Sequence, residues 1–259
     1  MAATGRVQYH EPGRSTARIL IDADGVPGNR IDPEYHWMTV PLHDARAPED
    51  CPTFDRDGLR FVTAPTTLRS PEAFDEARPA YEIELRQLLS QQLGADEVVV
   101  FDHTLRTETN RFRPPSFHVH CDYTRRSADQ RMLTLLGADR ARAWHSCRFA
   151  IVNAWRPLVH PVERAPLGFV LPRSVAPEDW VDVDIIFPQR RGQIRGLAYS
   201  EGHRWTYLDR IRPEQVALFT VYANQGVSGV PHAAIDIVET HNDARPRQSI
   251  ESRMFVRWA

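Results

Sequence analysis

A His-x-Asp pair with the spacing of metal ligands lies near the middle of the chain. His120 and Asp122 belong to the segment SFHVHCDY (116–123), which alternates polar and apolar residues and therefore predicts a β-strand. Residues i and i+2 of a strand point to the same face, so the imidazole and the carboxylate stand side by side, about 7 Å apart at Cα. This spacing allows both side chains to bind one metal ion.

A third ligand is expected from a histidine elsewhere in the chain. His232 in GVPHAAIDI follows a loop at 224–230 and opens a new predicted strand near the C-terminus. Two histidines and one carboxylate occupy one face of an octahedron and leave three positions open, which is the ligand set of non-haem Fe(II) oxygenases. His118, which has the same parity as His120, and His203 remain alternative ligands.

A receptor for a carboxylate follows the second histidine. Arg247, 15 residues after His232, shares one face of a predicted strand with Ser249. The guanidinium offers two parallel donors and the hydroxyl a third, which suits the far carboxylate of a 2-oxoglutarate whose keto-acid end chelates iron. Arg253 has the same parity and is the alternative receptor, and Glu251 between them is expected to pair with an arginine.

Four blocks of sequence occur in order over residues 101–258. They are VHCDYT (119–124), NAWRPL (153–158), HRWTYL (203–208) followed by EQVALF (214–219), and PHAAI (231–235) with PRQSIESR (246–253). Together they resemble the family of Fe(II)/2-oxoglutarate-dependent oxygenases that includes gibberellin desaturase, the cephamycin 7α-hydroxylase component and a fungal aziridine-forming oxygenase.

The resemblance implies both a fold and a chemistry. Members are double-stranded β-helix enzymes, and their motifs place the catalytic iron ligands on His120, Asp122 and His232 and the 2-oxoglutarate clamp on Arg247 and Ser249. Dioxygen is the second co-substrate. Hydroxylation, desaturation and ring formation all begin with hydrogen abstraction by an Fe(IV)-oxo group, so the resemblance implies a reaction class on a small specialised metabolite rather than one product.

Two further clusters are candidates for substrate binding. Asn153 and Trp155 share one face of a predicted strand, and Arg156 faces the other way. Trp205 and Tyr207 share a face and combine large apolar area with polar tips. Core packing is the alternative role for each of these side chains.

The surrounding elements predict a mainly β fold with flanking helices (α+β). A helix is expected over 71–94, with Ser70 as N-cap and Pro79 as a point where it divides, and a shorter one over 128–136. Short segments rich in β-branched and aromatic residues, separated by turn residues, favour an antiparallel barrel or jelly roll. Strands are expected at 17–23, 97–103, 116–123, 148–158, 168–172, 181–188, 204–209, 215–224, 232–238 and 249–258.

The domain organisation follows from the absence of any long linker. We expect one domain over 1–259, with a catalytic double-stranded β-helix core at 101–259. Residues 1–100 are expected to form an N-terminal extension, irregular up to about residue 70 apart from one strand, with the helix at 71–94 buttressing the barrel. The 110 residues between Asp122 and His232 must then carry additional strands or substrate loops.

Composition excludes several other classes. The chain has 259 residues, 32 Lys+Arg against 34 Asp+Glu and a formal net charge of −2, so there is no electrostatic case for nucleic acid or anionic membrane as a partner. Three cysteines without CxxC spacing argue against a disulfide framework or a thiolate zinc site. We expect a cytoplasmic enzyme with a small-molecule substrate, and the sequence leaves homo-oligomer formation open.

Two alternatives use the same residues. A cupin-like metal enzyme that does not use 2-oxoglutarate would keep the three ligands and make Arg247 structural, since zinc accepts the same donors. A non-catalytic partner subunit would bind neither iron nor keto acid.

Overall fold

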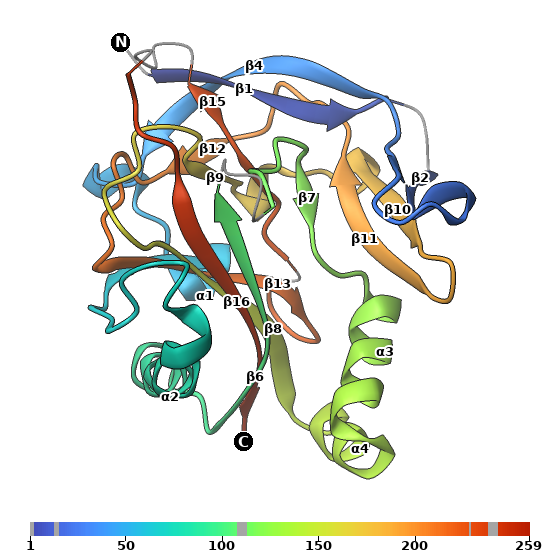
Figure 1. The fold of residues 1–259 in the computed structure, drawn as a ribbon, viewed down its shortest axis with the longest axis vertical. Coiled ribbons are helices and arrows are strands. Elements are labelled where there is room, and N and C mark those ends of the chain that lie inside the picture. Colours follow the sequence, from blue (N-terminus) through green and yellow to red (C-terminus); the bar gives the residue numbers. More distant parts are fainter. Residues whose placement is uncertain (1–2, 13–15, 108–112, 228, 238–242) are drawn as a thin grey trace.

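The computed structural model describes residues 3–12, 16–107, 113–227, 229–237 and 243–259, which form two β-sheets with helices outside them (Figure 1). Almost all neighbouring strands are antiparallel, as expected of a barrel or jelly roll; β10 with β2 and β12 with β4 are parallel. The larger sheet has the order β15 (Asp236–Ile237), β1 (Ala3–His10), β4 (Tyr35–Asp44), β12 (Trp205–Tyr207), β9 (Leu167–Val170), β14 (His232–Ala234), β7 (His120–Cys121), β11 (Arg191–Leu197), β10 (Trp180–Ile186), β2 (Thr16–Ile21) and β3 (Arg30–Ile31).

The smaller sheet is built from longer strands. Its order is β5 (Leu59–Thr63), β13 (Gln215–Ala223), β8 (Arg148–Pro157), β16 (Gln248–Trp258) and β6 (Glu97–Thr107). The helices are α1 (Phe54–Asp57), α2 (Phe74–Leu93), α3 (Arg125–Leu136) and α4 (Ala138–His145), with short 3₁₀ turns η1 (Ala23–Gly25), η2 (Pro48–Asp50), η3 (Pro172–Ser174) and η4 (Pro177–Asp179).

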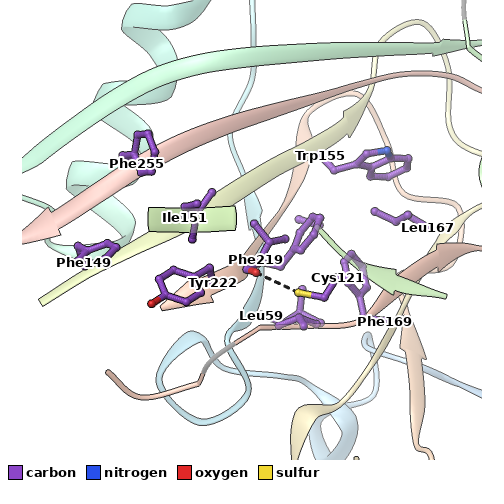
Figure 2. Packing of buried hydrophobic residues seen from close by; sticks show 14 of the residues in the cluster. Leu59, Cys121, Phe149, Ile151, Trp155, Leu167, Phe169, Phe219, Tyr222 and Phe255 are labelled. Atoms are coloured by element: carbon purple, nitrogen blue, oxygen red, sulfur yellow. Dashed lines mark hydrogen bonds between the residues drawn. The ribbon is translucent and has the colours of Figure 1, made fainter. Parts of the chain in front are cut away.

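The space between the sheets is filled by aliphatic and aromatic side chains (Figure 2). Trp155, Phe219 and Phe255 from the smaller sheet belong to the same buried cluster as Leu167 and Phe169 from the larger one. The rings of Phe169 and Phe219 meet edge to face, with centroids 5.0 Å apart. Aromatic burial on this scale dominates the packing energy of a barrel interior and excludes water from it.

The outer face of the smaller sheet is also buried, because α2 covers it. Ala154, Leu218 and Met254, which alternate with the inward residues, pack with Tyr81 and Leu85 of the helix. β8 is consequently buried along its whole length apart from its first residue. Such a strand shows no polar face from which the inward direction can be read.

The helices differ from expectation in detail. α2 begins at Phe74, three residues later than predicted, and continues unbroken through Pro79. Ile83, in the middle of this helix, is exposed. α3 begins at Arg125 behind a capping box of Thr124 and Ser127, and α4 was not predicted.

The prediction for residues 1–70 is wrong. Instead of one strand this region supplies five, and β1 and β4 lie inside the larger sheet. β2 pairs with β10 and β5 with β13, so the region is hydrogen-bonded into both sheets. β11 was also missed, and the strand expected at 116–123 is regular only over His120–Cys121. Val238, at the end of another expected strand, lies outside the described residues.

No helix among the described residues has both the length and the apolar character needed to cross a membrane.

The three cysteines are free thiols, and only Cys121 is buried.

A buried phenol connects β1 to the rest of the larger sheet. The Tyr9 hydroxyl accepts a hydrogen bond from Trp205 Nε1 at 2.9 Å and lies 3.1 Å from His203 Nδ1. Replacing Tyr9 by Phe leaves the buried indole N–H without this acceptor. We expect Tyr9→Phe to lower the free energy of unfolding by about 1–3 kcal/mol in urea denaturation. A loss below about 0.5 kcal/mol, typical of surface substitutions, would contradict this role.

Candidate metal centre

The register of two short strands brings the two predicted histidines together. His120 of β7 is the direct antiparallel partner of His232 of β14, and their ring centroids are 4.6 Å apart. Asp122 follows β7 on the same face, with Oδ1 3.6 Å from His120 Nε2. One potential ligand atom from each of the three residues lies within 4.8 Å of the others, close enough for one ion to bind all three.

Both imidazoles are oriented by the chain that precedes them. His120 Nδ1 donates to the carbonyl of His118 at 2.8 Å, and His232 Nδ1 donates to the carbonyl of Val230 at 3.1 Å. Since a carbonyl only accepts, each Nδ1 carries the proton and each Nε2 presents a lone pair. Burial, together with His232, lowers the pKa of His120 to about 3, so the ring is neutral at physiological pH.

The carboxylate of Asp122 is oriented by donors from the opposite sheet. Its Oδ2 accepts hydrogen bonds from Asn153 Nδ2 at 2.8 Å and from Arg253 Nε at 2.9 Å. Burial alone would raise the pKa of Asp122, but the charge of Arg253 beside it outweighs burial and holds that pKa well below its usual value. The group is therefore an anion with Oδ1 left for a metal.

Arg253 has almost all of its donors occupied. Besides the bond to Asp122, Nη1 donates to Asp102 Oδ2 at 2.8 Å and to Thr104 Oγ1 at 2.9 Å, and Nη2 donates to Glu251. The expected pairing of Glu251 with an arginine of this strand is confirmed. One of the five guanidinium N–H groups is left, which is too few for a bidentate clamp on a further carboxylate.

Arg247 directly precedes the same strand, and Ser249 lies near its start. They are 1% and 0% exposed, and Arg247 Nη1 donates to the carbonyl of Ala165 at 2.5 Å while its Cζ lies 5.4 Å from the Trp155 ring centroid. Among the described residues, Ser249 Oγ has no hydrogen-bond partner although it is buried. A buried hydroxyl without a partner is costly unless a ligand oxygen or a water completes it.

The structure separates the predicted substrate residues into two groups. Trp155 belongs to the barrel interior, and Asn153 is bonded to Asp122. Arg156 points toward α2, where its Cζ lies 5.8 Å from the Tyr81 ring centroid, and its Nη1 donates to the carbonyl of Ala64 at 2.9 Å. Trp205 and Tyr207 pack in the outer apolar layer of the larger sheet. The last three are therefore not brought to the triad.

The two alternative histidine ligands have other partners. His118 Nδ1 lies 2.8 Å from Ser116 Oγ. His203 is held between Tyr9 and Asp179. Neither belongs to a group of potential metal ligands among the described residues.

One wall of the centre was missed by the sequence analysis. The ring of Tyr35, in β4, stacks on His118 at 5.2 Å between centroids, and His118 lies 4.7 Å from His120. No local pattern marks Tyr35, because it approaches the site only through the pairing of β4 with β1. Cys121 lies between His120 and Asp122 in the chain, and alternation along the strand turns its side chain away from theirs. Its Sγ donates to the carbonyl of Val221 at 3.1 Å, and burial raises its pKa to about 12 (Figure 2).

Comparison with known proteins agrees with this geometry. The family model described as "YDMC: Oxidoreductase/YMDC permease-like domain" matches residues 7–257. "Fe(II)/2-oxoglutarate-dependent dioxygenase nvfI" of Aspergillus novofumigatus is 32% identical over 236 residues, covering 86% of this chain and 84% of that protein. The chain belongs to the Fe(II)/2-oxoglutarate-dependent oxygenase family.

Other members of the family extend the match. "Hydroxylase/desaturase efuI" of Hormonema carpetanum is 27% identical over 258 residues, covering 87% of this chain and 85% of that protein. The solved structure of "iron and alpha-ketoglutarate-dependent endoperoxidase NvfI" superposes with a TM-score of 0.85 at 28% identity, over 98% of this chain and 97% of that one.

These matches confirm several expectations. The fold is a double-stranded β-helix, and the protein is an oxidoreductase that uses Fe(II), 2-oxoglutarate and dioxygen on a small-molecule substrate. Family membership favours this enzyme class over the cupin-like and non-catalytic alternatives. The assignment of individual residues to these cofactors rests on the geometry above.

Removing one imidazole tests the triad. We expect His120→Ala or His232→Ala to weaken Fe(II) binding under anaerobic conditions by more than about 100-fold, because losing a ligand costs more than losing a group that orients one. His118→Ala is the matched control, because the His118 carbonyl that orients His120 belongs to the backbone and remains. Equal losses for His118→Ala and His120→Ala in equilibrium dialysis would refute the assignment.

Proposed function

We propose that this oxygenase oxidises a C–H bond of a small, largely apolar specialised metabolite, with His120, Asp122 and His232 holding the iron. The observation that carries the proposal is the convergence of three ligand atoms within 4.8 Å while both Nδ1 atoms are engaged by carbonyls. The remaining positions of an octahedral ion are then free for the keto acid and dioxygen.

We further propose that Arg247 and Ser249 receive the far carboxylate of 2-oxoglutarate. Three features support this choice over Arg253. Ser249 Oγ is a buried hydroxyl that a carboxylate oxygen would satisfy, Arg247 two residues earlier is a buried arginine, and Arg253 has one donor left. Ala165, which accepts from Arg247, has a φ of 50°, an uncommon conformation for a residue with a Cβ that directs its carbonyl to the arginine.

The bound iron and 2-oxoglutarate supply the activation of dioxygen and the removal of hydrogen from the substrate. The protein itself positions the metal ligands and excludes water from the centre. His120 and His232 offer neutral nitrogen donors, and Asp122 offers one oxygen. The ring of Phe219 lies 4.7 Å from that of His232, and Phe169 and Trp155 extend the same apolar wall (Figure 2). Excluding water from this volume protects a reactive centre from side reactions.

The proposed substrate class is supported by the aromatic residues of the barrel interior and by the names of the related proteins. Aromatic walls favour a partly apolar molecule, and a net charge of −2 supports a small-molecule partner rather than nucleic acid. Relatives named hydroxylase/desaturase and endoperoxidase show that the family gives several products, so hydroxylation, desaturation and cyclisation all remain within the proposal. We propose a single domain over 1–259, because the N-terminal strands belong to both sheets.

Anaerobic optical titration tests the cofactor assignment. Fe(II) chelated by a keto acid gives a weak visible metal-to-ligand charge-transfer band, which we expect for the wild type and not for Asp122→Ala. In Arg247→Ala the 2-oxoglutarate concentration needed for half of the band should rise by about 10- to 100-fold, because a charge-assisted bidentate pair is lost.

Arg245→Ala is the matched control for this titration. Arg245 lies two residues away on the surface, where it pairs with Glu163, and its removal should leave the titration unchanged. If Arg247→Ala titrates like the wild type, the clamp assignment is wrong. If the wild type binds Fe(II) without the band, 2-oxoglutarate does not chelate at this centre and the cupin-like alternative returns.

A further inference from the structure

We propose that Arg253 is a positioning residue that restricts Asp122 to binding the metal through one oxygen. This inference rests on the proposed role of His120, Asp122 and His232 as iron ligands. Arg253 itself touches neither metal nor substrate in this role. It acts through the carboxylate it holds, together with Asn153.

The two oxygens of Asp122 have different surroundings. Oδ2 accepts two hydrogen bonds, at 2.9 Å from Arg253 Nε and at 2.8 Å from Asn153 Nδ2. Oδ1 lies on the side of His120 Nε2, at 3.6 Å. An oxygen whose lone pairs face two donors is a poor ligand for a cation. The donors therefore leave Oδ1 as the ligand and keep a coordination position from being taken by a second carboxylate oxygen.

The donors are fixed because they belong to paired strands of the other sheet. Arg253 of β16 is the direct partner of Asn153 of β8 and of Asp102 of β6. The three side chains stand in a row across the inner face of the smaller sheet, opposite Asp122 of the larger sheet. The bonds to Asp122 thus cross the barrel and set the position of the carboxylate relative to the sheet that carries both histidines.

The guanidinium of Arg253 is itself immobilised. Asp102, Thr104 and Glu251 receive its remaining bonds, and the side chain is 12% exposed. A long arginine side chain held at both Nη atoms cannot turn away from Asp122 without breaking several charge-assisted hydrogen bonds. An outer group of this kind holds the ligand in its binding position before the ion arrives.

Arg257 offers a matched control for the test. It lies on the same strand, pairs with Glu97 at 3.0 Å and contacts neither Asp122 nor the histidines. Arg253→Gln and Arg257→Gln therefore make the same chemical change on β16, one at the centre and one away from it. Arg253→Lys keeps the charge but presents a single nitrogen, which cannot span Asp122, Asp102 and Glu251 together.

The probe is Co(II) alone, titrated into metal-free protein with no 2-oxoglutarate and followed through its d–d absorption. For Arg253→Gln we expect a 10- to 100-fold higher dissociation constant for Co(II), because the group that orients the Asp122 carboxylate is lost. We also expect an altered band shape at saturation, because the carboxylate is then free to bind through both oxygens. Arg253→Lys should lie between Arg253→Gln and the wild type. Arg257→Gln should match the wild type in both affinity and spectrum.

Two results would overturn the proposal. One is an Arg253→Gln protein that binds Co(II) with the affinity and spectrum of the wild type. The other is an equal change in Arg257→Gln, which would indicate a general effect of weakening β16. Circular dichroism and thermal melting show whether each variant is folded. If Arg253→Gln is not, Arg253→Lys takes its place, and wild-type affinity and spectrum for Arg253→Lys refute the role.

Failure of the proposed function has a different signature. If Asp122→Ala still binds Co(II), or if the wild type binds none, the assignment of His120, Asp122 and His232 as metal ligands is refuted. If Co(II) binding depends on Asp122 but is unchanged in Arg253→Gln, only the positioning role of Arg253 is refuted. The absence of 2-oxoglutarate from the titration keeps the result independent of Arg247 and Ser249.

Discussion

The buried Asp122 carboxylate is the charge around which the barrel interior is arranged. A lone anion in an apolar interior is strongly unfavourable, so it persists only with partners that replace water. Here the partners come from the opposite sheet, from which Arg253 and Asn153 donate hydrogen bonds to the carboxylate. The same contacts that make the charge tolerable also join the two sheets at the level of the metal centre. Folding and preparation of the site are therefore linked.

Strand register supplies the second constraint. His120 and His232 are 112 residues apart in sequence and directly opposite in β7 and β14. A one-residue slip would turn one imidazole to the other face, because side chains alternate along a strand. The intervening chain contributes β8 to β13 together with α3 and α4, and it returns to the larger sheet at the position where the histidines meet. The long separation therefore supplies two strands of the smaller sheet, β8 and β13, and four of the larger one, β9 to β12.

Local periodicity predicted the elements of the site that depend on it. The period of two predicted that Asp122 lies beside His120, and the structure places it directly after β7 with Oδ1 3.6 Å from His120 Nε2. The direction in which a side chain faces could not be predicted where both faces of a strand are buried. β8 has no polar side, so nothing in the sequence indicated that Arg156 points toward α2. Trp205 and Tyr207 likewise pack in an apolar layer outside the barrel. The role of Arg253 was beyond reach, because its partners Asp102, Asp122 and Asn153 lie on three other segments that only tertiary pairing brings together.

The N-terminal strands contribute rings to a stack that ends beside His120. Tyr35 of β4 stacks on His118, whose ring lies 4.7 Å from that of His120. His10 of β1 packs edge to face on the same Tyr35, with ring centroids 4.9 Å apart. This wall comes from strands outside the four motif blocks, whereas the ligands, Asn153 and Arg253 all come from within them. The proposed iron ligands and the rings of this wall thus come from different parts of the chain, so the wall can vary without changing the residues of the triad.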